Sequence, residues 1–338
     1  MKIRVAVNGY GRIGRCVVRS LFESDFFFDR IKVVAINEMA DLETIFHLTK
    51  YDSTHGQFRT SVERTTEGML IEGERILVIN ERNPEKLPWK ELAVDVVLEC
   101  TGSFTDRKTA EKHIKSGAKK LIFSHPASSD VDATIVHGVN HHLLKPEHTI
   151  ISNASCTTNC IVPILHILDQ TFGIQFGTIT TIHSAMHDQP IIDAYNRDLR
   201  KTRSAMRSII PVSTGLDKGI SRILPSLEGR FETLAIRVPT TNVSIMDLTV
   251  MVGTRATAGE VNVTLKQASE ERLQGILGYT EEQLVSCDFN HDSRSAIVDS
   301  NQTRVSGDHL VKVLTWFDNE WGFSNRMLDT TVSAMGKR

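Results

Sequence analysis

The stretch 152–160 reads Ser-Asn-Ala-Ser-Cys-Thr-Thr-Asn-Cys, and its central Cys156 has the strongest potential for chemistry in the chain. An apolar run, 149–151, precedes this stretch, and apolar residues at helical spacing follow it from Ile161. Because Ser, Asn and Thr favour helix starts, Cys156 is expected at a helix N-terminus, where backbone amides stabilise an anion. We therefore predict a nucleophilic thiol with a depressed pKa that is partly thiolate at neutral pH.

Cys160, in the same stretch, shows the ordinary alternative for a cysteine. Most single cysteines are small buried hydrophobic residues, and Cys160 fits that description because it lies in the apolar part of the same expected helix. Cys156 differs in its polar surroundings, but a reactive thiol also needs a base elsewhere in the chain.

His183 ends the β-type run 177–183 and is the predicted base for this thiol. An imidazole beside a thiol removes its proton and stabilises the thiolate. A purely structural histidine is the usual alternative among the 13 in the chain. The sequence favours His183 only narrowly over His187 and His125.

Residues 8–14, Asn-Gly-Tyr-Gly-Arg-Ile-Gly, contain a G-x-G-x-x-G motif of the kind that binds dinucleotides. A short apolar strand precedes the motif, a helix from about Arg12 follows it, and a second apolar run leads to Glu38. Gly9 would allow the tight turn, and Gly11 would allow a pyrophosphate to approach the backbone. Glu38 lies where a carboxylate bonds the adenosine ribose and repels a 2′-phosphate, which predicts NAD rather than NADP. A plain tight turn between strand and helix is the alternative.

Three further apolar runs, 94–98, 120–123 and 149–151, are typical of buried parallel strands that end in small polar residues. Ligands of such sheets bind at the carboxyl ends of the strands. Thr101 and Ser124, which follow the first two runs, are therefore predicted to contact the cofactor. The third run leads into the cysteine stretch, which is thereby expected at the edge of the cofactor site.

A change of pattern near residue 155 predicts two domains. Beyond it, 177–183 is β-rich, and two long β-type runs, 231–252 and 304–317, alternate in part, as antiparallel strands with one covered face do. We expect an α/β protein whose Rossmann dinucleotide-binding domain spans residues 1–155 and is completed by a C-terminal helix in 319–338. Residues 156–318 are expected to form an α+β substrate domain with a mainly antiparallel sheet.

The overall composition is that of an ordinary globular protein. The chain has 338 residues, of which 40% are hydrophobic and 24% charged, and its net charge is −2. Without a long Lys/Arg run or a long uncharged apolar stretch, we expect neither a nucleic-acid partner nor a membrane. The five scattered cysteines predict reduced thiols and, with a start that runs directly into a strand, indicate a cytoplasmic protein. The Cys and His spacing does not match a zinc site, so no metal is expected.

Several polar pieces of the second half are suited to bind phosphate. Basic residues recur in 198–203 around Lys201, while 213–215 offers the hydroxyls of Ser and Thr214 beside the bare backbone of Gly215. Arg237 adds a guanidinium fork. Together these pieces suggest an anionic substrate, although each alone is weak and 198–203 is more simply a solvated helix face.

These motifs together resemble the glyceraldehyde-3-phosphate dehydrogenase family over essentially the whole chain. The segments that carry the resemblance are 8–14, 152–159, 183–184, 213–215, 237–240 and 318–322. The cysteine motif is the most specific of them. The resemblance implies a Rossmann domain, an α/β substrate domain, NAD, a small phosphorylated aldehyde as substrate, and a homotetramer.

The resemblance also implies roles for individual residues. It implies that Cys156 is the nucleophile and that His183 is its base. The residues that it places in phosphate sites are Ser155, Thr157, Thr214 and Gly215 in one site and Arg237 in the other. The residues that it places on NAD are Arg12 and Ile13 at the pyrophosphate, Arg82 on the adenosine side and Asn319 at the nicotinamide amide.

Departures from the family pattern indicate one branch of it. The triose enzymes usually have a phosphate-binding Thr where this chain has Met186, and a Tyr where it has Phe323. His125 replaces a common Ala, and Lys201 replaces an Arg, whose two-pronged phosphate contact Lys does not reproduce. Glu38 stands where Asp is typical. This set resembles the D-erythrose-4-phosphate dehydrogenase branch, whose longer aldehyde tolerates the loss of the Thr.

The expected function is NAD-dependent oxidation of D-erythrose 4-phosphate to 4-phosphoerythronate through a cysteine thioester, which the resemblance links to pyridoxal phosphate biosynthesis. The nearest alternative is a phosphorylating glyceraldehyde-3-phosphate dehydrogenase of glycolysis. A cysteine-dependent semialdehyde or acyl-phosphate reductase is a second alternative, less compatible with Glu38. A non-catalytic NAD-sensing or RNA-binding scaffold is a third, less compatible with Cys156 and His183.

Overall fold

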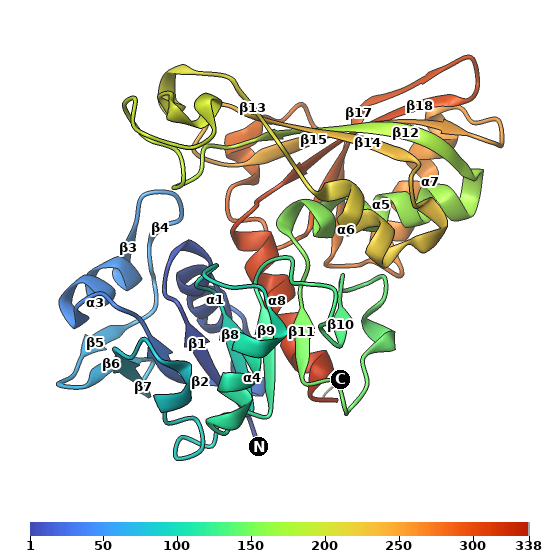
Figure 1. The fold of residues 1–338 in the computed structure, drawn as a ribbon. Coiled ribbons are helices and arrows are strands. Elements are labelled where there is room, and N and C mark those ends of the chain that lie inside the picture. The colour runs from blue at the N-terminus through green and yellow to red at the C-terminus, as the bar shows by residue number, and fades with distance from the viewer. Residues whose placement is uncertain (337–338) are drawn as a thin grey trace. The chain divides into compact units, whose positions relative to one another are not determined.

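The computed structural model describes residues 1–336 as two compact units. The first unit comprises Met1–Ser155 and the chain from Ser324 onward, and the second comprises Cys156–Phe323. Figure 1 shows both units coloured by residue number. Of the terminal helix predicted in 319–338, residues 337–338 lie outside the described residues. No helix of the described chain has both the length and the apolar character needed to cross a bilayer.

The first unit is built on one nine-stranded sheet. Its strands are β1 (Ile3–Asn8), β2 (Ile31–Asn37), β5 (Val62–Arg64), β6 (Gly68–Ile71), β7 (Glu74–Ile79), β8 (Val96–Glu99), β9 (Lys120–Phe123), β10 (Ala133–Thr134) and β11 (Ile150–Ser152). They lie in the order β10-β11-β9-β8-β1-β2-β7-β6-β5. Pairing is parallel from β10 to β7, and β6 and β5 extend the edge antiparallel. This parallel sheet confirms the predicted Rossmann arrangement.

Short helices connect these strands. They are α1 (Arg12–Phe22), α2 (Asp25–Arg30), α3 (Leu42–Lys50) and α4 (Arg107–Lys115), and a small hairpin of β3 (Tyr51–Asp52) and β4 (Gly56–Gln57) follows α3. Side-chain caps fix the starts of α3 and α4, where Asp41 and Asp106 accept the amides of Thr44 and Thr109. Such caps satisfy amides that have no partner within the helix.

The glycine motif forms the turn between β1 and α1. Gly9 has a φ of +89°, which side chains disfavour, and a Cβ there would come 2.6 Å from the amide nitrogen of Thr101. A Cβ on Gly14 would come 2.2 Å from the carbonyl oxygen of Gly9, so only glycine allows α1 to lie this close to β1. A Cβ on Gly11 would meet open space out to 4 Å in the described part of the chain. The backbone at Gly11 is therefore accessible.

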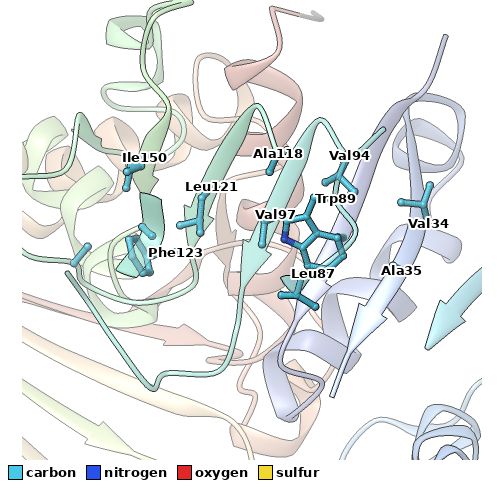
Figure 2. Packing of buried hydrophobic residues seen from close by; sticks show 13 residues of the cluster. Val34, Ala35, Leu87, Trp89, Val94, Val97, Ala118, Leu121, Phe123 and Ile150 are labelled. Atoms are coloured by element: carbon cyan, nitrogen blue, oxygen red, sulfur yellow. The ribbon is translucent and has the colours of Figure 1, made fainter. Parts of the chain in front are cut away.

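A buried hydrophobic cluster fixes the strands of the first unit (Figure 2). Trp89 is fully buried and lies beside Leu87 and Val97. Burying an aromatic ring of this size stabilises a fold by roughly 4–6 kcal/mol relative to leaving it exposed. The indole N–H of Trp89 donates to Nδ1 of His113 at 3.0 Å, which satisfies its one polar atom.

The second unit contains one seven-stranded sheet. Its strands are β12 (Ile174–His183), β13 (Ile210–Val212), β14 (Phe231–Arg237), β15 (Ser244–Val252), β16 (Leu277–Thr280), β17 (Ala296–Ser306) and β18 (Leu310–Phe317). The order is β13-β14-β12-β15-β18-β17-β16, and four of the six pairings are antiparallel, which confirms the predicted sheet type. In Figure 1, α5 (Cys156–Phe172), α6 (Leu216–Ile223) and α7 (Ala258–Glu270) lie on one side of this sheet.

The last helix, α8 (Trp321–Ala334), begins in the second unit and continues into the first. Asp318 anchors its start, because its Oδ1 accepts the amides of Glu320 and Trp321 at 3.0 and 2.8 Å. Within the first unit, the Thr330 hydroxyl of α8 donates to Asn153.

Candidate active site

Cys156 is the first residue of α5, so the structure has it at a helix N-terminus, as the sequence predicts. The backbone N–H groups of Cys156 itself and of Thr157 act on its sulfur as hydrogen-bond donors. Cys160, one helical turn later, is fully buried, as predicted. Ser155 directly precedes the helix. The chain thus presents a thiol together with two amides at the start of a long helix.

His183, the last residue of β12, faces this thiol, with Nε2 lying 3.9 Å from Sγ of Cys156. The other ring nitrogen, Nδ1, lies 2.8 Å from the carbonyl oxygen of Ser184. A carbonyl only accepts, so Nδ1 carries the hydrogen and Nε2 offers a lone pair to the thiol. Of the alternative bases, His187 is exposed, and Nε2 of His125 lies 2.9 Å from a backbone carbonyl in the first unit.

The protonation of this pair differs from the sequence-based prediction. Burial raises the pKa of the Cys156 thiol to about 11, although Arg237 and the two amides act to lower it. Burial also lowers the pKa of His183 to about 4. The prediction of a resting thiolate is therefore wrong, because at neutral pH the pair is a thiol and a neutral imidazole. The helix start acts in the predicted direction and the Arg237 guanidinium adds to its effect, but removing the sulfur from water outweighs both.

Arg237 supplies the positive charge of this site. It ends β14 and lies opposite His183 in the β12–β14 register. Its Nη1 is buried and has no hydrogen-bond partner among residues 1–336. An unsatisfied buried donor is unfavourable by about 1–3 kcal/mol, so this atom is suited to an anionic group of a ligand. Asp188 acts electrostatically on both Arg237 and His183, and Lys201 lies 3.3 Å from Asp188 at the rim.

The starts of α5 and α6 form a second polar feature of the unit. Gly215 precedes α6, and Oγ1 of Thr214 accepts the amide of Leu216 at 3.3 Å. A Cβ on Gly219 would come 2.7 Å from the hydroxyl of Thr158, so the first turns of the two helices touch. Two neighbouring helix N-termini suit a phosphate group.

Asn319 is held by two serine hydroxyls that sequence reasoning missed. Ser184 and Ser244 each donate to Oδ1 of Asn319 at 3.0 Å, which leaves Nδ2 of Asn319 as a donor. Ser184 therefore orients the amide through its hydroxyl and the ring of His183 through its carbonyl. Ser184 belongs to the recognised His-Ser pair, but its contact with Asn319 joins residues 135 positions apart and leaves no local pattern.

A cavity of about 470 Å³ lies at the carboxyl edge of the first unit's sheet. The predicted cofactor residues that line it are Gly9, Gly11, Glu38, Arg82 and Thr101. The two carboxylate oxygens of Glu38 accept the amides of Tyr10 and Met39 at 2.7 and 2.6 Å, which fixes the carboxylate in place. An accessible glycine backbone beside a fixed carboxylate fits the pyrophosphate and ribose of a dinucleotide.

Several predicted cofactor residues do not line this cavity. The guanidinium of Arg12 pairs with Asp52, so Arg12 and its neighbour Ile13 contribute the first turn of α1 rather than a free cation. Ser124 follows β9, and its amide donates to the backbone carbonyl oxygen of Glu99 at 3.0 Å. Asn319 belongs to the second unit.

A larger hollow of about 820 Å³ in the first unit contains none of the predicted site residues. Its lining includes His137, His141 and Lys120, and Lys120 is the first residue of β9. The hollow therefore lies at the amino edge of the sheet, whereas open parallel sheets bind ligands at the carboxyl edge. The smaller cavity is the better match to a dinucleotide.

Comparison with protein families agrees with both parts of this geometry. Residues 3–107 match the NAD binding domain of glyceraldehyde 3-phosphate dehydrogenase, and residues 155–319 match the C-terminal domain of the same enzyme. The fold and these matches define an NAD-dependent dehydrogenase, an oxidoreductase whose N-terminal domain binds NAD. The chain belongs to the glyceraldehyde-3-phosphate dehydrogenase family.

Proposed function

We propose that this chain oxidises D-erythrose 4-phosphate to 4-phosphoerythronate, with Cys156 as nucleophile and His183 as base. The observation that carries the chemistry is the 3.9 Å separation of His183 Nε2 from Cys156 Sγ, with the tautomer set by the Ser184 carbonyl. Membership of the family supports NAD-dependent oxidation of an aldehyde. The residue roles and the four-carbon substrate are our inference.

The first step is attack by Sγ of Cys156 on the aldehyde carbon while the thiol proton passes to Nε2 of His183. Because both groups are neutral at rest, the proton moves during the attack rather than before it. The amides of Cys156 and Thr157 stabilise the negative charge that forms on the aldehyde oxygen. His183 then returns the proton to this oxygen, which gives a hemithioacetal.

Oxidation of the hemithioacetal leaves a thioester on Cys156. Bound NAD supplies the acceptor for the hydride that leaves the carbon. His183 takes the hydroxyl proton as the carbonyl re-forms, a role that typically contributes roughly 100- to 10,000-fold to rate. His183, free again after losing this proton to solvent, activates water for hydrolysis, which releases the acid and restores the thiol.

NAD is assigned in this proposal to the cavity at the carboxyl edge of the first unit. The accessible backbone at Gly11 and the first turn of α1, with Arg12 and Ile13, would receive the pyrophosphate. Glu38 would accept the ribose hydroxyls. The residues proposed for the remaining contacts are Gly9, Arg82, Thr101 and Ser124 around the nucleotide and Asn319, through Nδ2, at the nicotinamide amide.

Met186 is the basis for choosing the four-carbon substrate. A thioether cannot donate a hydrogen bond, so Met186 cannot replace the phosphate-binding Thr of the triose enzymes. The unpartnered Nη1 of Arg237 and the starts of α5 and α6, with Ser155, Thr157, Thr214 and Gly215, are the proposed anion contacts. Lys201 is proposed as a further charge at the rim.

A comparison of two aldehydes tests the substrate. We expect NADH formation from D-erythrose 4-phosphate to exceed that from glyceraldehyde 3-phosphate by about tenfold or more in kcat/KM, without added phosphate. Met186→Thr should shift this ratio toward the triose by roughly tenfold, since one phosphate hydrogen bond is worth about 1.5 kcal/mol. Met186→Leu, which also lacks a donor, is the matched control. A preference for the triose that requires phosphate would identify the glycolytic activity instead, and inertness toward both would revive the scaffold hypothesis.

The proposal also includes a homotetramer in the cytoplasm. Four apolar side chains of the segment between β12 and β13 are at least 77% exposed: Ile191, Ile192, Tyr195 and Leu199. Several exposed apolar side chains in one short segment are typical of a protein interaction surface, which supports subunit association. Light scattering of the purified protein measures the number of subunits.

A further inference from the structure

A row of buried polar side chains crosses the carboxyl edge of the first unit's sheet, and the chemistry described above does not use it. Asn37 ends β2, Asn8 ends β1 and Glu99 ends β8, and these three strands are neighbours in the sheet. The three residues are 5%, 5% and 0% exposed, respectively. We call these residues the Glu99 row.

Hydrogen bonds along the Glu99 row run in one direction. Nδ2 of Asn37 donates to Oδ1 of Asn8 at 2.7 Å, and Nδ2 of Asn8 donates to Oε2 of Glu99 at 2.5 Å. Oε1 of Glu99 accepts the amide of Thr101 at 2.8 Å and also its hydroxyl. Beyond the other end, Oδ1 of Asn37 accepts the amide of Glu81 at 3.0 Å. Glu99 is thus the acceptor on which the side-chain donors of the row converge.

The electrostatic surroundings of Glu99 are unfavourable for a carboxylate. Burial raises its pKa, while hydrogen bonds from Thr101 and Asn8 act against the rise, and no cation among the described residues contributes. His113 Nε2 lies 3.9 Å from Oε2, but burial lowers the pKa of His113 to about 4, so this contact is not an ion pair at neutral pH. Buried acids are usually paired with a cation, and Glu99 departs from this pattern. Such departures concentrate at functional sites.

The Glu99 row lies at the cavity assigned to NAD. Asn8, Asn37, Glu81 and Thr101 all line that cavity. Asn8 directly precedes Gly9, whose backbone packs on the Thr101 amide so closely that a Cβ would not fit. The row therefore joins the glycine turn to the segments that follow β2 and β8.

We propose that Glu99 is a positioning residue for the dinucleotide, which fixes the spacing between the glycine turn and the Thr101 loop by accepting three hydrogen bonds. Glu99 itself does not line the cavity, so it acts through Asn8 and Thr101. This inference rests on the proposed assignment of NAD to the cavity. The proposal predicts that affinity for NAD depends on which side chain of the Glu99 row donates each hydrogen bond and which accepts it. The size and the polarity of the side chains alone should not determine this affinity.

An exchange of partners across one hydrogen bond tests this inference. Glu99→Gln places an amide NH₂ against a donor of Asn8 or Thr101, and Asn8→Asp places a second carboxylate against Glu99. In the double variant Asn8→Asp/Glu99→Gln the new amide donates to the new carboxylate. The remaining amide oxygen still accepts from Thr101, and the remaining carboxylate oxygen still accepts from Asn37. Size and total charge equal those of the parent.

The primary measurement is the Kd of NAD by calorimetry in the absence of aldehyde, with thermal unfolding recorded in parallel. Each single variant should raise Kd by about tenfold or more, as expected for a lost hydrogen bond to a charged group. The double variant should return Kd to within about threefold of the parent, a margin of roughly 0.7 kcal/mol. The KM for NAD in turnover should change in parallel with Kd across the three variants.

Two results would overturn the role of Glu99. One is a parental Kd in both single variants, and the other is a folded double variant that binds NAD no better than a single one. If a single variant does not fold, the double variant remains decisive, because the proposed role requires it to fold and to bind NAD. Glu38→Gln tests the cavity assignment separately. An unchanged Kd of NAD in Glu38→Gln would contradict the proposed NAD site. Weaker NAD binding in Glu38→Gln, together with a double variant that does not recover NAD binding, would contradict only the role of Glu99.

Discussion

Cys156 and His183 each carry a group whose charged form is disfavoured by burial. The thiol has a pKa of about 11 and the imidazole a pKa of about 4, so both groups are uncharged at neutral pH. The Ser184 carbonyl makes Nε2 of His183 an acceptor, which lets the thiol lose its proton only as a new bond to sulfur forms. The reactivity of Cys156 should therefore depend on His183 as base and on the hydroxide concentration, rather than on a thiolate that already exists at neutral pH.

Alkylation of Cys156 by iodoacetamide measures this behaviour. Near neutral pH, where the neutral imidazole of His183 accepts the proton, its rate should vary little. Above about pH 8 its rate should rise by up to tenfold per pH unit, because the thiolate fraction of a thiol with a pKa of about 11 does so. His183→Asn should slow alkylation at pH 7 by about tenfold or more, since the proton acceptor is lost. Arg237→Gln should also slow it, because the guanidinium lowers the pKa of Cys156.

Mass spectrometry of the labelled peptides gives the rates, and the exposed Cys287 serves as an internal reference that neither substitution should affect. A rate in the parent protein that stays level from pH 7 to 10 would contradict the neutral pair and would indicate a thiolate–imidazolium ion pair.

At the scale of the element, the start of α8 depends on Asp318. This residue is 2% exposed, and besides the two helix amides it accepts the amide of His291 at 2.9 Å and Nδ2 of Asn242 at 2.7 Å. Asp318→Asn turns one oxygen into a donor that faces donors, which should lower the free energy of unfolding by about 2 kcal/mol or more. The measurement is urea unfolding of the whole protein.

The matched control for this prediction is Asp41→Asn at the start of α3. Asp41 is an exposed cap, and Asn caps helices about as well as Asp, so the change should stay below about 0.5 kcal/mol. Equal losses in the two variants would show that the four donors around Asp318 do not matter.

The same element scale shows what the sequence could and could not predict. The glycine turn, the strand that ends at His183 and the helix that starts at Cys156 follow from local spacing, and the structure has all three. The hydrogen bond between Asn8 and Glu99 joins residues 91 positions apart, so it could not be predicted from residue type or spacing. The pKa of Cys156 was mispredicted for a related reason, because desolvation depends on packing from distant segments.

At the scale of the whole molecule, three histidines are neutral because they are removed from water, two of them fully and His137 in part. His113 and His137 in the first unit and His183 in the second each have a pKa lowered to about 4. In the unfolded chain a histidine titrates near 6.5. As pH falls from 6.5 toward 4 the unfolded state therefore takes up protons that the folded state does not, and stability falls.

Acidification from pH 7 to 5 should lower the free energy of unfolding by about 2 kcal/mol for each of these histidines. Glu99 acts in the opposite direction, because burial raises its pKa and the folded state takes up a proton first. His137→Gln removes one titrating group, so the loss between pH 7 and 5 should shrink by about 2 kcal/mol. Urea unfolding of the parent and of His137→Gln at the two pH values decides, and an undiminished loss in the variant would show that this half-buried ring takes up its proton in the folded state.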